Sequence, residues 1–381
     1  MAHQGKTLWV KSGLVIVLLS VALAFWLFCS KTPVNSVESG PEDEAGVYSL
    51  ANPAVQKIKD VQEQSTKDLM SNPDVVGTAI GLTTDGKPAV LILTAKEMKT
   101  AAFDRKLLRQ MAAGGVLPSS IEGHPVVVMN TGKIYAMAKP SKPAPVSHTA
   151  MQAPPIKLGT SGGFADDLDN GYCCGGTLGS LVKKGTAVYI LSNYHVFYGD
   201  LADANKGGDV IQPGLIDVNC SKSSAQVVAK LEGTRSLPNS NVDAGLAEIV
   251  PGMVDPSGSI LEIGTLSATT LAASINQAVK KSGRTSGLTT STISGLNGTV
   301  SIQYEVNCAG EAAFTKTFTG QILIANRSSK FLKAGDSGSL MVQNVSTNPK
   351  AIGLLFAGST SIAIANPINE VLTFFGATMV G

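Results

Sequence analysis

The segment Gly335-Asp336-Ser337-Gly338 contains the residue types needed for covalent chemistry. A serine hydroxyl is a weak nucleophile near neutral pH. It needs a base to take its proton, a carboxylate to orient that base, and backbone N–H groups to stabilise an oxyanion. Gly335 has no Cβ, which allows the close backbone approach that an oxyanion hole requires. If Ser337 is a nucleophile, the rest of the chain must supply a base and an acid.

Of the four histidines, His195 is the best candidate for the base. It follows the apolar run 188–191 and a polar turn, so a strand end would hold it rigidly beside open space. His3, His124 and His148 lie in the N-terminal leader, in a turn and in a Pro-rich stretch. A histidine that only caps a short helical turn is the alternative, and the serine motif makes it the weaker one.

Asp243 is the best candidate for the acid that orients the base. It opens an otherwise apolar strand, where an unpaired carboxylate would be costly, and a hydrogen bond to His195 would explain its position. Its ordinary alternative is a residue that makes a local turn. Asp209 and Asp217 are rivals, but both lie in loops marked by Gly and Pro.

The elements that must position these residues are short β-strands divided by Gly, Ser and Asn, which is typical of an antiparallel barrel or sandwich. Strands are predicted at 177–182, 187–191, 226–231, 242–249, 292–304, 314–324, 338–342 and 351–356. A helix is predicted after Asn366-Pro367, with the asparagine as its cap and the proline at its first position.

A small α+β domain is predicted upstream, over residues 48–138. Its pattern predicts a helix at 55–69, strands at 75–82 and 89–93 joined through Asp85-Gly86, a helix at 101–111, and strands at 126–129 and 134–137. This order is compatible with a ferredoxin-like sandwich. Residues 139–158 are Pro-rich and lack periodicity, so they are predicted to be an extended linker.

The N-terminus has the pattern of an export signal. Lys6 and Lys11 precede an apolar run over 13–29, and an acidic, Pro- and Ser-containing linker follows at 30–47. Residues 1–29 are therefore a signal peptide or a membrane anchor, and both fit. The protein is expected outside the cytoplasm, either secreted or periplasmic or held at the membrane.

Composition excludes some classes of function. The net charge is +2 and no basic cluster with interleaved aromatics occurs, so no nucleic-acid partner is expected. No metal or cofactor is expected, because no histidine stands near the cysteines at ligand spacing. Cys173, Cys174, Cys220 and Cys308 allow three pairings that the sequence does not separate, and buried free thiols are the alternative.

Two further motifs could also carry a function. The segment 159–163 fits the G-x-S-x-G pattern of a nucleophile elbow around Ser161, but no strand is predicted before it and no helix after it, so we interpret it as chance. Arg284, in the sequence Gly-Arg-Thr-Ser-Gly, could bind a substrate carboxylate, although a β-turn is the commoner meaning.

The order His195, Asp243, Ser337 resembles that of the chymotrypsin-like (trypsin-fold) serine proteases, with about fifty residues from base to acid and about ninety more to the serine. More narrowly, several segments over residues 155–381 resemble bacterial trypsin-like peptidases. These segments are 176–179, 191–196, 283–289, 335–340 and 353–358.

The resemblance implies a mainly β fold, with a two-barrel chymotrypsin-like domain at 159–381 and the catalytic residues in the cleft between the barrels. It implies His195 as general base, Asp243 as its orienting acid and Ser337 as nucleophile. The N–H groups of Gly335 and Ser337 would form the oxyanion hole.

The same resemblance implies substrate contacts. Phe331 stands six residues before Ser337, where trypsin has an acid, so the specificity pocket is expected to be shallow or apolar. The small residues of Phe356-Ala357-Gly358 would line a peptide groove. Val196 stands where many trypsins have a cysteine, and Ser339 replaces the second glycine of the animal enzymes.

Two functions follow from this reading. The first is an exported serine endopeptidase that cuts protein or peptide substrates through an acyl-enzyme. The alternative is a non-catalytic or self-processing-only protein that keeps the protease fold as a binding or scaffold module, tethered at the membrane through the N-terminal segment if that segment is not cleaved.

Overall fold

The computed structural model describes residues 48–137, 148–198, 206–304 and 314–381. The predicted signal or anchor at 1–29 and the linker at 30–47 lie outside these residues. Among the helices that are described, none is both long enough and apolar enough to cross a membrane.

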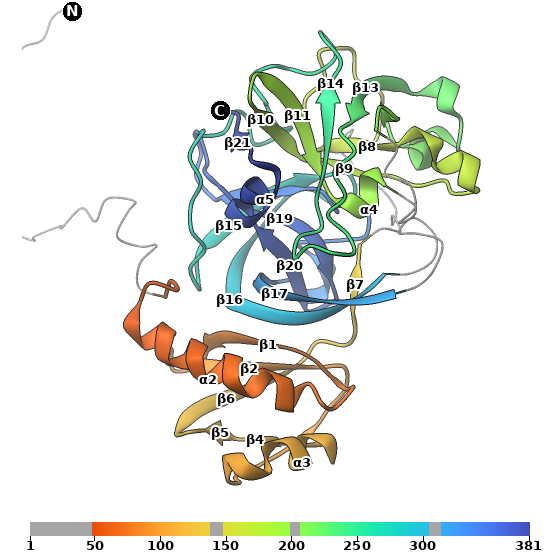
Figure 1. Ribbon diagram of the computed structural model, residues 1–381. Helices are drawn as coiled ribbons and strands as arrows, with labels where there is room; N and C mark the ends of the chain where they lie inside the picture. Colours follow the sequence, from red (N-terminus) through yellow and green to blue (C-terminus); the bar gives the residue numbers. More distant parts are fainter. Residues whose placement is uncertain (1–47, 138–147, 199–205, 305–313) are drawn as a thin grey trace, which may run out of the picture. The chain divides into compact units, whose positions relative to one another are not determined.

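Two β-barrels make up most of the described chain (Figure 1). The strands of the first barrel are β8 (Thr160–Phe164), β9 (Gly176–Leu178), β10 (Ser180–Lys184), β11 (Ala187–Ser192), β12 (Asp209–Gln212), β13 (Gln226–Leu231) and β14 (Gly245–Ile249). β9 and β10 form one strand interrupted only at Gly179. Because β9 pairs with β8 while β10 pairs with β11, the sheet closes on itself.

The second barrel is also closed. Its strands are β15 (Ala278–Gly283), β16 (Gly287–Tyr304), β17 (Phe314–Ala325), β18 (Leu340–Gln343), β19 (Ala351–Gly358) and β20 (Ile362–Pro367). The strand order is β15-β18-β19-β20-β17-β16, and β15 pairs with β16 as well as with β18, which returns the order to its start. The predicted mainly β, two-barrel fold class is therefore confirmed.

Two short helices follow strands of the barrels. The helix α4 (Tyr194–Phe197) follows β11, and α5 (Ile368–Phe375) follows β20 and leads to the edge strand β21 (Thr378–Met379). The predicted cap of α5 is wrong by one residue, because Pro367 rather than Asn366 is the cap residue. Asn366 is buried and its side chain bonds the backbone of Asp243 instead.

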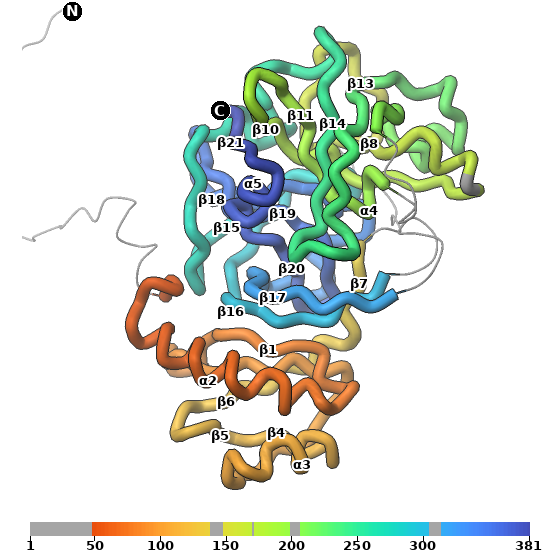
Figure 2. Tube along the Cα trace, viewed as in Figure 1, coloured from red at the N-terminus to blue at the C-terminus, as the bar shows by residue number. Residues whose placement is uncertain are grey.

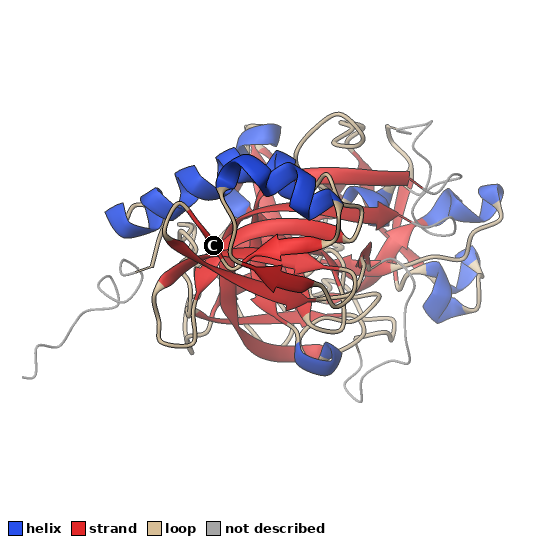
Figure 3. Cartoon of the chain, turned by 90° about the horizontal axis from the view of Figure 1, so that it is seen from below, coloured by secondary structure: helices blue, strands red, loops and turns tan. Residues whose placement is uncertain are grey.

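The small α+β domain is built on a single long helix, α2 (Pro53–Leu69). It begins where the side chain of Asn52 accepts a hydrogen bond from the N–H of Ala54 at 2.8 Å. Its buried face, which includes Val55 and Ile58, packs on β1 (Val75–Leu82) and β2 (Pro88–Thr94). In Figure 3 the long helix lies across the strands of this sheet.

The sheet of the small domain continues into the second barrel. β1 pairs with β2 on one side and with β16 on the other, through Gly77↔Val300 and Ile80↔Leu296. The remaining elements are β3 (Lys99–Ala101), α3 (Leu108–Ala113), β4 (Val116–Pro118), β5 (Ser120–Ile121) and β6 (His124–Asn130). β6 pairs in parallel with β2. Because β2 pairs with β1 and β1 pairs with β16, backbone hydrogen bonds connect the small domain to the second barrel.

The strand predicted at 134–137 exists as β7 (Ile134–Ala136), but it pairs with none of the other strands of the small domain. It pairs in parallel with β16 and antiparallel with β19. Figure 2 follows the chain from the small domain along β7 toward the barrel. A period-2 pattern shows that a strand forms but not which strand it pairs with, so the sequence did not predict these two partners.

The second described part of the chain begins at His148, inside the stretch 139–158 that is predicted to be a linker. The His148 ring is fully buried, with Nδ1 2.7 Å from the carbonyl oxygen of Gly159 and Nε2 2.7 Å from Oε2 of Glu262. Ile156 is also buried. His148 is therefore a structural histidine that ties the start of the first barrel to a loop of the second.

A disulfide joins Cys173 to Cys220 and closes a loop with a sequence separation of 47 residues. It settles one pairing that the sequence left open. Cys308 lies outside the described residues.

Replacing Cys173 and Cys220 together by Ser should lower the free energy of unfolding by about 2–5 kcal/mol, because the unfolded chain is no longer cross-linked. Urea unfolding of the wild type and the double variant measures this difference. Unchanged stability would contradict the pairing, as would a non-reducing digest in which these two cysteines are not linked.

Candidate active site

The His195 imidazole and the Asp243 carboxylate form a buried pair. Nδ1 of His195 lies 2.6 Å from Oδ2 of Asp243, and the backbone N–H of His195 donates to Oδ1 at 3.3 Å. His195 is 3 % exposed and Asp243 is fully buried. A carboxylate accepts hydrogen bonds, so in the neutral imidazole this contact places the proton on Nδ1 and the lone pair on Nε2.

Nε2 of His195 is buried and has no hydrogen-bond partner among the described residues. An unpartnered buried polar atom is costly, and an active site is one of the few places that explains it. The His195 ring is therefore oriented by Asp243, and its Nε2 is left without a partner.

Three side chains that the sequence analysis did not assign to the candidate site donate hydrogen bonds to Asp243. The Tyr304 hydroxyl donates to Oδ2 at 2.9 Å. The side-chain amides of Asn193 and Asn366 both donate to the backbone carbonyl oxygen of Asp243, at 2.8 and 3.2 Å. Burial and the neighbouring Asp243 charge raise the pKa of Tyr304 well above its usual value, so Tyr304 remains a donor. No motif in the sequence announces Tyr304, which lies within a long strand.

The two alternative acids, Asp209 and Asp217, pair with basic residues rather than with His195. Asp217 makes a buried, two-point ion pair with Arg284, whose Nε donates to Oδ2 at 2.8 Å. It also accepts a hydrogen bond from the hydroxyl of Ser161 at 2.5 Å. Asp209 pairs with Lys230 on the surface. Arg284 therefore binds an internal carboxylate, and the G-x-S-x-G serine lies within strand β8 with its hydroxyl engaged.

Ser337 lies in a loop that presses against the first barrel. The loop residue Gly338 has φ +89°, and a Cβ there would overlap Ser192 and the carbonyl oxygen of Thr177. The N–H of Thr177 donates to the carbonyl oxygen of Ser337 at 2.8 Å. Ser192 is the last residue of β11, and His195 follows it three residues later. The loop that contains Ser337 therefore packs against the end of the strand that leads to His195.

The Ser337 hydroxyl is hydrogen-bonded within the described chain. It donates to the carbonyl oxygen of Met137 at 3.0 Å, with a second contact to that of Phe356 at 3.3 Å. The N–H of Gly335, predicted for the oxyanion hole, also donates to the Met137 carbonyl oxygen, at 2.9 Å. Gly335 has φ +93°, a conformation that favours glycine and aims this N–H at its acceptor.

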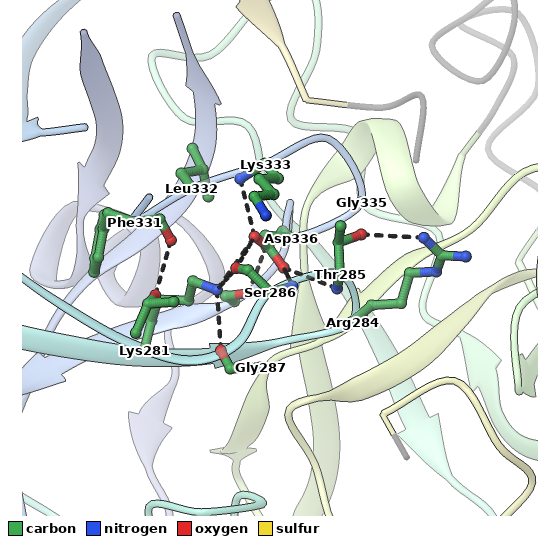
Figure 4. A network of polar contacts seen from close by, with 12 residues as sticks. Lys281, Arg284, Thr285, Ser286, Gly287, Phe331, Leu332, Lys333, Gly335 and Asp336 are labelled. Atoms are coloured by element: carbon green, nitrogen blue, oxygen red, sulfur yellow. Dashed lines mark hydrogen bonds and ion pairs between the residues drawn. The ribbon is translucent and has the colours of Figure 1, made fainter. Parts of the chain in front are cut away.

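The loop between Gly335 and Ser337 is held by the side chain of Asp336, which is fully buried (Figure 4). Oδ1 accepts from the N–H groups of Thr285 and Ser286 at 2.9 and 3.0 Å, and Oδ2 accepts from the N–H of Lys333 at 2.9 Å. The ammonium group of Lys281 lies 3.2 Å from Oδ2 and is fully buried.

A lysine side chain is ordinarily solvated, but that of Lys281 is fully buried. Burial lowers its pKa, while the Asp336 charge opposes that shift. The cation is needed there because Asp336 would otherwise be an uncompensated buried charge.

Three of the residues predicted to contact substrate lie on β19, and the fourth lies in the loop before Ser337. Phe356, Ala357 and Gly358 are buried at the end of β19, and Phe331 is 2 % exposed. Phe331 and Leu332 belong to one apolar cluster, against which Met137 packs. The surroundings of Phe331 are therefore apolar.

A separate cleft of about 1140 Å³ runs along α2, with Glu63, Asn241 and Thr319 in its walls. None of His195, Asp243, Ser337 or Gly335 lines it. Its volume alone does not make it the reactive site, because the oriented base and the Gly335–Ser337 loop lie elsewhere. In the part of the chain that the structure describes, no group of three or more His, Cys, Asp or Glu residues could hold a metal ion.

Comparison with known proteins gives limited matches. The profile described as the Nal1 C-terminal domain matches residues 243–365, less than half of the chain. Comparison with curated proteins finds no significant match.

Several solved structures are similar. A glutamic-acid-specific serine protease, described as using a histidine triad in substrate binding, shares 21% identity over 59% of this chain and 100% of that chain, with a TM-score of 0.39. Thermobifida fusca Protease A shares 22% identity over 59% of this chain and 98% of that chain, with a TM-score of 0.40. Nocardiopsis protease shares 14% identity, with a TM-score of 0.39, over 59% of this chain and 99% of that chain.

Two closed barrels, established above by the strand pairings, are the fold of the chymotrypsin-like class. The solved structures are what the chain is similar to, and the candidate site rests on the contacts given above.

Replacing Lys281 by Met should destabilise the protein by about 3–5 kcal/mol, because Asp336 becomes an unpaired buried charge. The matched control is Lys280→Met on the same strand, which loses one hydrogen bond to the carbonyl oxygen of Val345 and should cost about 0.5–1.5 kcal/mol. Urea unfolding measures both. Equal losses in the two variants would show that the Lys281–Asp336 pair does not hold this loop.

Proposed function

We propose that the chain is an exported serine endopeptidase with His195 as general base, Asp243 as its orienting acid and Ser337 as nucleophile. The observation that carries the proposal is the buried His195–Asp243 pair at 2.6 Å with an unpartnered Nε2. A base in this state can take a proton from a hydroxyl without first breaking another hydrogen bond.

The oxyanion hole would be formed by the N–H groups of Gly335 and Ser337. Support comes from Gly335, whose N–H already donates to a peptide carbonyl oxygen at 2.9 Å. That length lies within the range at which such donors stabilise an oxyanion. The buried Asp336–Lys281 pair would keep this loop preorganised, so that little reorganisation accompanies the reaction.

The substrate would be an extended peptide or protein segment laid along β19, with an apolar side chain in the pocket beside Phe331 and Gly358. Backbone hydrogen bonding to a strand edge is a common way to bind peptides. Ala357 and Gly358 pair with β7 in this structure, so the peptide would take the place of β7 along that edge. The proposed reaction needs no cofactor, because the proton passes between Ser337 and His195 while the acyl group passes from the substrate to Ser337 and then to water.

Export would follow from the N-terminal pattern of Lys6, Lys11 and the apolar run 13–29. The Cys173–Cys220 disulfide supports it, because disulfides persist in oxidising compartments outside the cytoplasm. If the N-terminal segment is not removed, it would hold the enzyme at a membrane.

A second function is favoured by one observation. The Ser337 hydroxyl donates to the carbonyl oxygens of Met137 and Phe356 rather than to His195. A protein that keeps this arrangement would bind peptides, or process only itself, without turning over other substrates.

A fluorophosphonate probe and a casein substrate separate these functions. Ser337→Ala should abolish labelling, and both Ser337→Ala and His195→Ala should reduce proteolysis by on the order of 10⁶-fold. Ser161→Ala is the matched control, because it removes the competing serine and should label like the wild type. A folded wild-type chain that neither labels nor cuts casein would leave the binding module as the function.

Replacing Tyr304 by Phe should lower kcat by roughly 10- to 100-fold and leave KM nearly unchanged, because a hydrogen bond to a charged group is worth about 1.5–3 kcal/mol. The control is Tyr198→Phe, whose buried hydroxyl accepts from the N–H of Gly233 instead. Steady-state kinetics on a casein-derived peptide measures both variants. Unchanged kcat in Tyr304→Phe would mean that Tyr304 does not help to orient the acid.

A further inference from the structure

His148 is bound to the start of the first barrel through both its backbone and its ring. Its carbonyl oxygen accepts hydrogen bonds from the N–H of Ser161 at 2.7 Å and from the hydroxyl of Thr160 at 2.9 Å. Nδ1 of the ring lies 2.7 Å from the carbonyl oxygen of Gly159, and because a carbonyl oxygen only accepts, Nδ1 donates this hydrogen bond. These contacts fix the ring, and with it the position of Nε2.

Glu262 connects that ring to the β15–β16 turn, residues 283–288. Its Oε2 lies 2.7 Å from Nε2 of His148 and accepts a hydrogen bond from the N–H of Leu288 at 2.9 Å. Glu262 has φ +63°, a backbone conformation that is costly for a residue with a Cβ and persists where the surrounding structure requires it. A Cβ on Gly287 would lie 3.3 Å from both Oε2 of Glu262 and Nε2 of His148, so the pair packs directly against this turn.

The β15–β16 turn holds the Asp336 side chain. The N–H groups of Thr285 and Ser286 donate to Oδ1 of Asp336, as described above. The carbonyl oxygen of Gly287 accepts a hydrogen bond from the ammonium group of Lys281 at 3.1 Å. Lys281 thus contacts both the turn and the Asp336 carboxylate (Figure 4). Because Asp336 lies between the two residues proposed for the oxyanion hole, the position of the turn determines the position of that loop.

Charge provides a second coupling between Glu262 and the loop. Burial lowers the pKa of Lys281, and the carboxylates of Asp336 and Glu262 both oppose that shift. The Glu262 charge therefore favours the charged form of the lysine that the buried Asp336 needs as its partner. This coupling acts through space and does not depend on the hydrogen bond to Leu288.

We propose that His148 and Glu262 are positioning residues for the reaction: they hold the β15–β16 turn, and through the turn they hold the Gly335–Ser337 loop in its reactive shape. The proposal rests on the proposed serine endopeptidase function. Neither residue contacts a proposed reacting group or β19, so their loss should lower the rate of the chemical step and not the binding of substrate. A pair that only joined the two barrels would instead change stability and leave kcat of the folded protein unchanged.

Steady-state kinetics on a casein-derived peptide tests the role of Glu262. Glu262→Ala should lower kcat by roughly 10- to 100-fold and leave KM nearly unchanged, because a displacement of about 1 Å caused far from the reacting groups can cost on the order of 100-fold in rate. Glu262→Gln keeps a side-chain oxygen that accepts from the N–H of Leu288, so it should restore most of the activity.

The matched control is Glu232→Ala, just after β13 in the first barrel. Glu232 also binds one basic side chain and one backbone N–H: Nζ of Lys184 at 2.8 Å and the N–H of Thr234 at 2.8 Å. It makes no contact with the β15–β16 turn among the described residues, so Glu232→Ala should keep the wild-type kcat. Circular dichroism and urea unfolding confirm that each variant is folded under the assay conditions.

A double-mutant cycle tests whether the two positioning residues act as one unit. If they do, His148→Ala combined with Glu262→Ala should lower kcat no further than the more severe of the two single variants. Losses that multiply in the double variant would show that His148 does not act through Glu262, and would overturn the pair.

Hydrogen exchange measures the same coupling without substrate. In the wild type the N–H groups of Gly335, Gly338 and Ser339 are hydrogen-bonded. They should exchange at least about tenfold faster in Glu262→Ala, which is the effect of losing roughly one hydrogen bond to a charged group. Glu232→Ala should exchange at the wild-type rate.

The outcomes separate this proposal from the proposed function. An active wild type beside a folded Glu262→Ala variant with wild-type kcat, or with a change in KM alone, overturns the positioning role and leaves the endopeptidase standing. Equal losses in Glu232→Ala, or a lower kcat without faster exchange in the loop, also overturn it. If the wild type neither reacts with a fluorophosphonate probe nor cuts casein, the proposed function fails, and the positioning role fails with it.

Discussion

The burial of the Asp243 carboxylate is the constraint around which the site is built. A charged group without solvent contact is tolerated only when hydrogen bonds and an opposite charge or dipole surround it. The partners come from both barrels: His195 from the helix after β11, and Tyr304 from the end of β16. Asp243 therefore joins the two barrels at the position where it also orients the His195 ring.

The same physical rule shapes the loop that contains the serine. Asp336 is buried, and it draws Lys281 and three backbone N–H groups around itself. Its neighbours in the chain, Gly335 and Ser337, are fixed as a consequence. Because these contacts are internal to the second barrel, the loop reaches its shape without any group supplied by a substrate.

The remaining polar groups of that loop also need partners. The N–H of Gly335 and the hydroxyl of Ser337 both donate to the Met137 carbonyl oxygen, which arrives on β7 from the small domain. The small domain can deliver this segment because β1 pairs with β16, so the sheet is continuous between the two parts. The domain is thus hydrogen-bonded to the barrel and is not merely attached through a linker.

The sequence alone predicted much of this fold and part of the candidate site. Apolar runs separated by turn residues predicted most of the strands, since alternation reflects which side chains face the core. The order and spacing of His195, Asp243 and Ser337 resemble those of the chymotrypsin-like proteases, and that resemblance implied the fold class. A lone carboxylate opening an apolar strand pointed to a partner for it. The strands and the carboxylate are local features, and local physics is enough to predict them.

Only the tertiary structure determined which residues contact one another. Tyr304, Asn366, Lys281 and Met137 carry no motif, because a strand pattern records burial and not the identity of the neighbour. The strand at 134–136 joined the barrel rather than its own domain, and Asn366 bonded Asp243 rather than capping a helix. Hydrogen-bond partners distant in the chain are chosen by three-dimensional packing, so only the folded chain determines them.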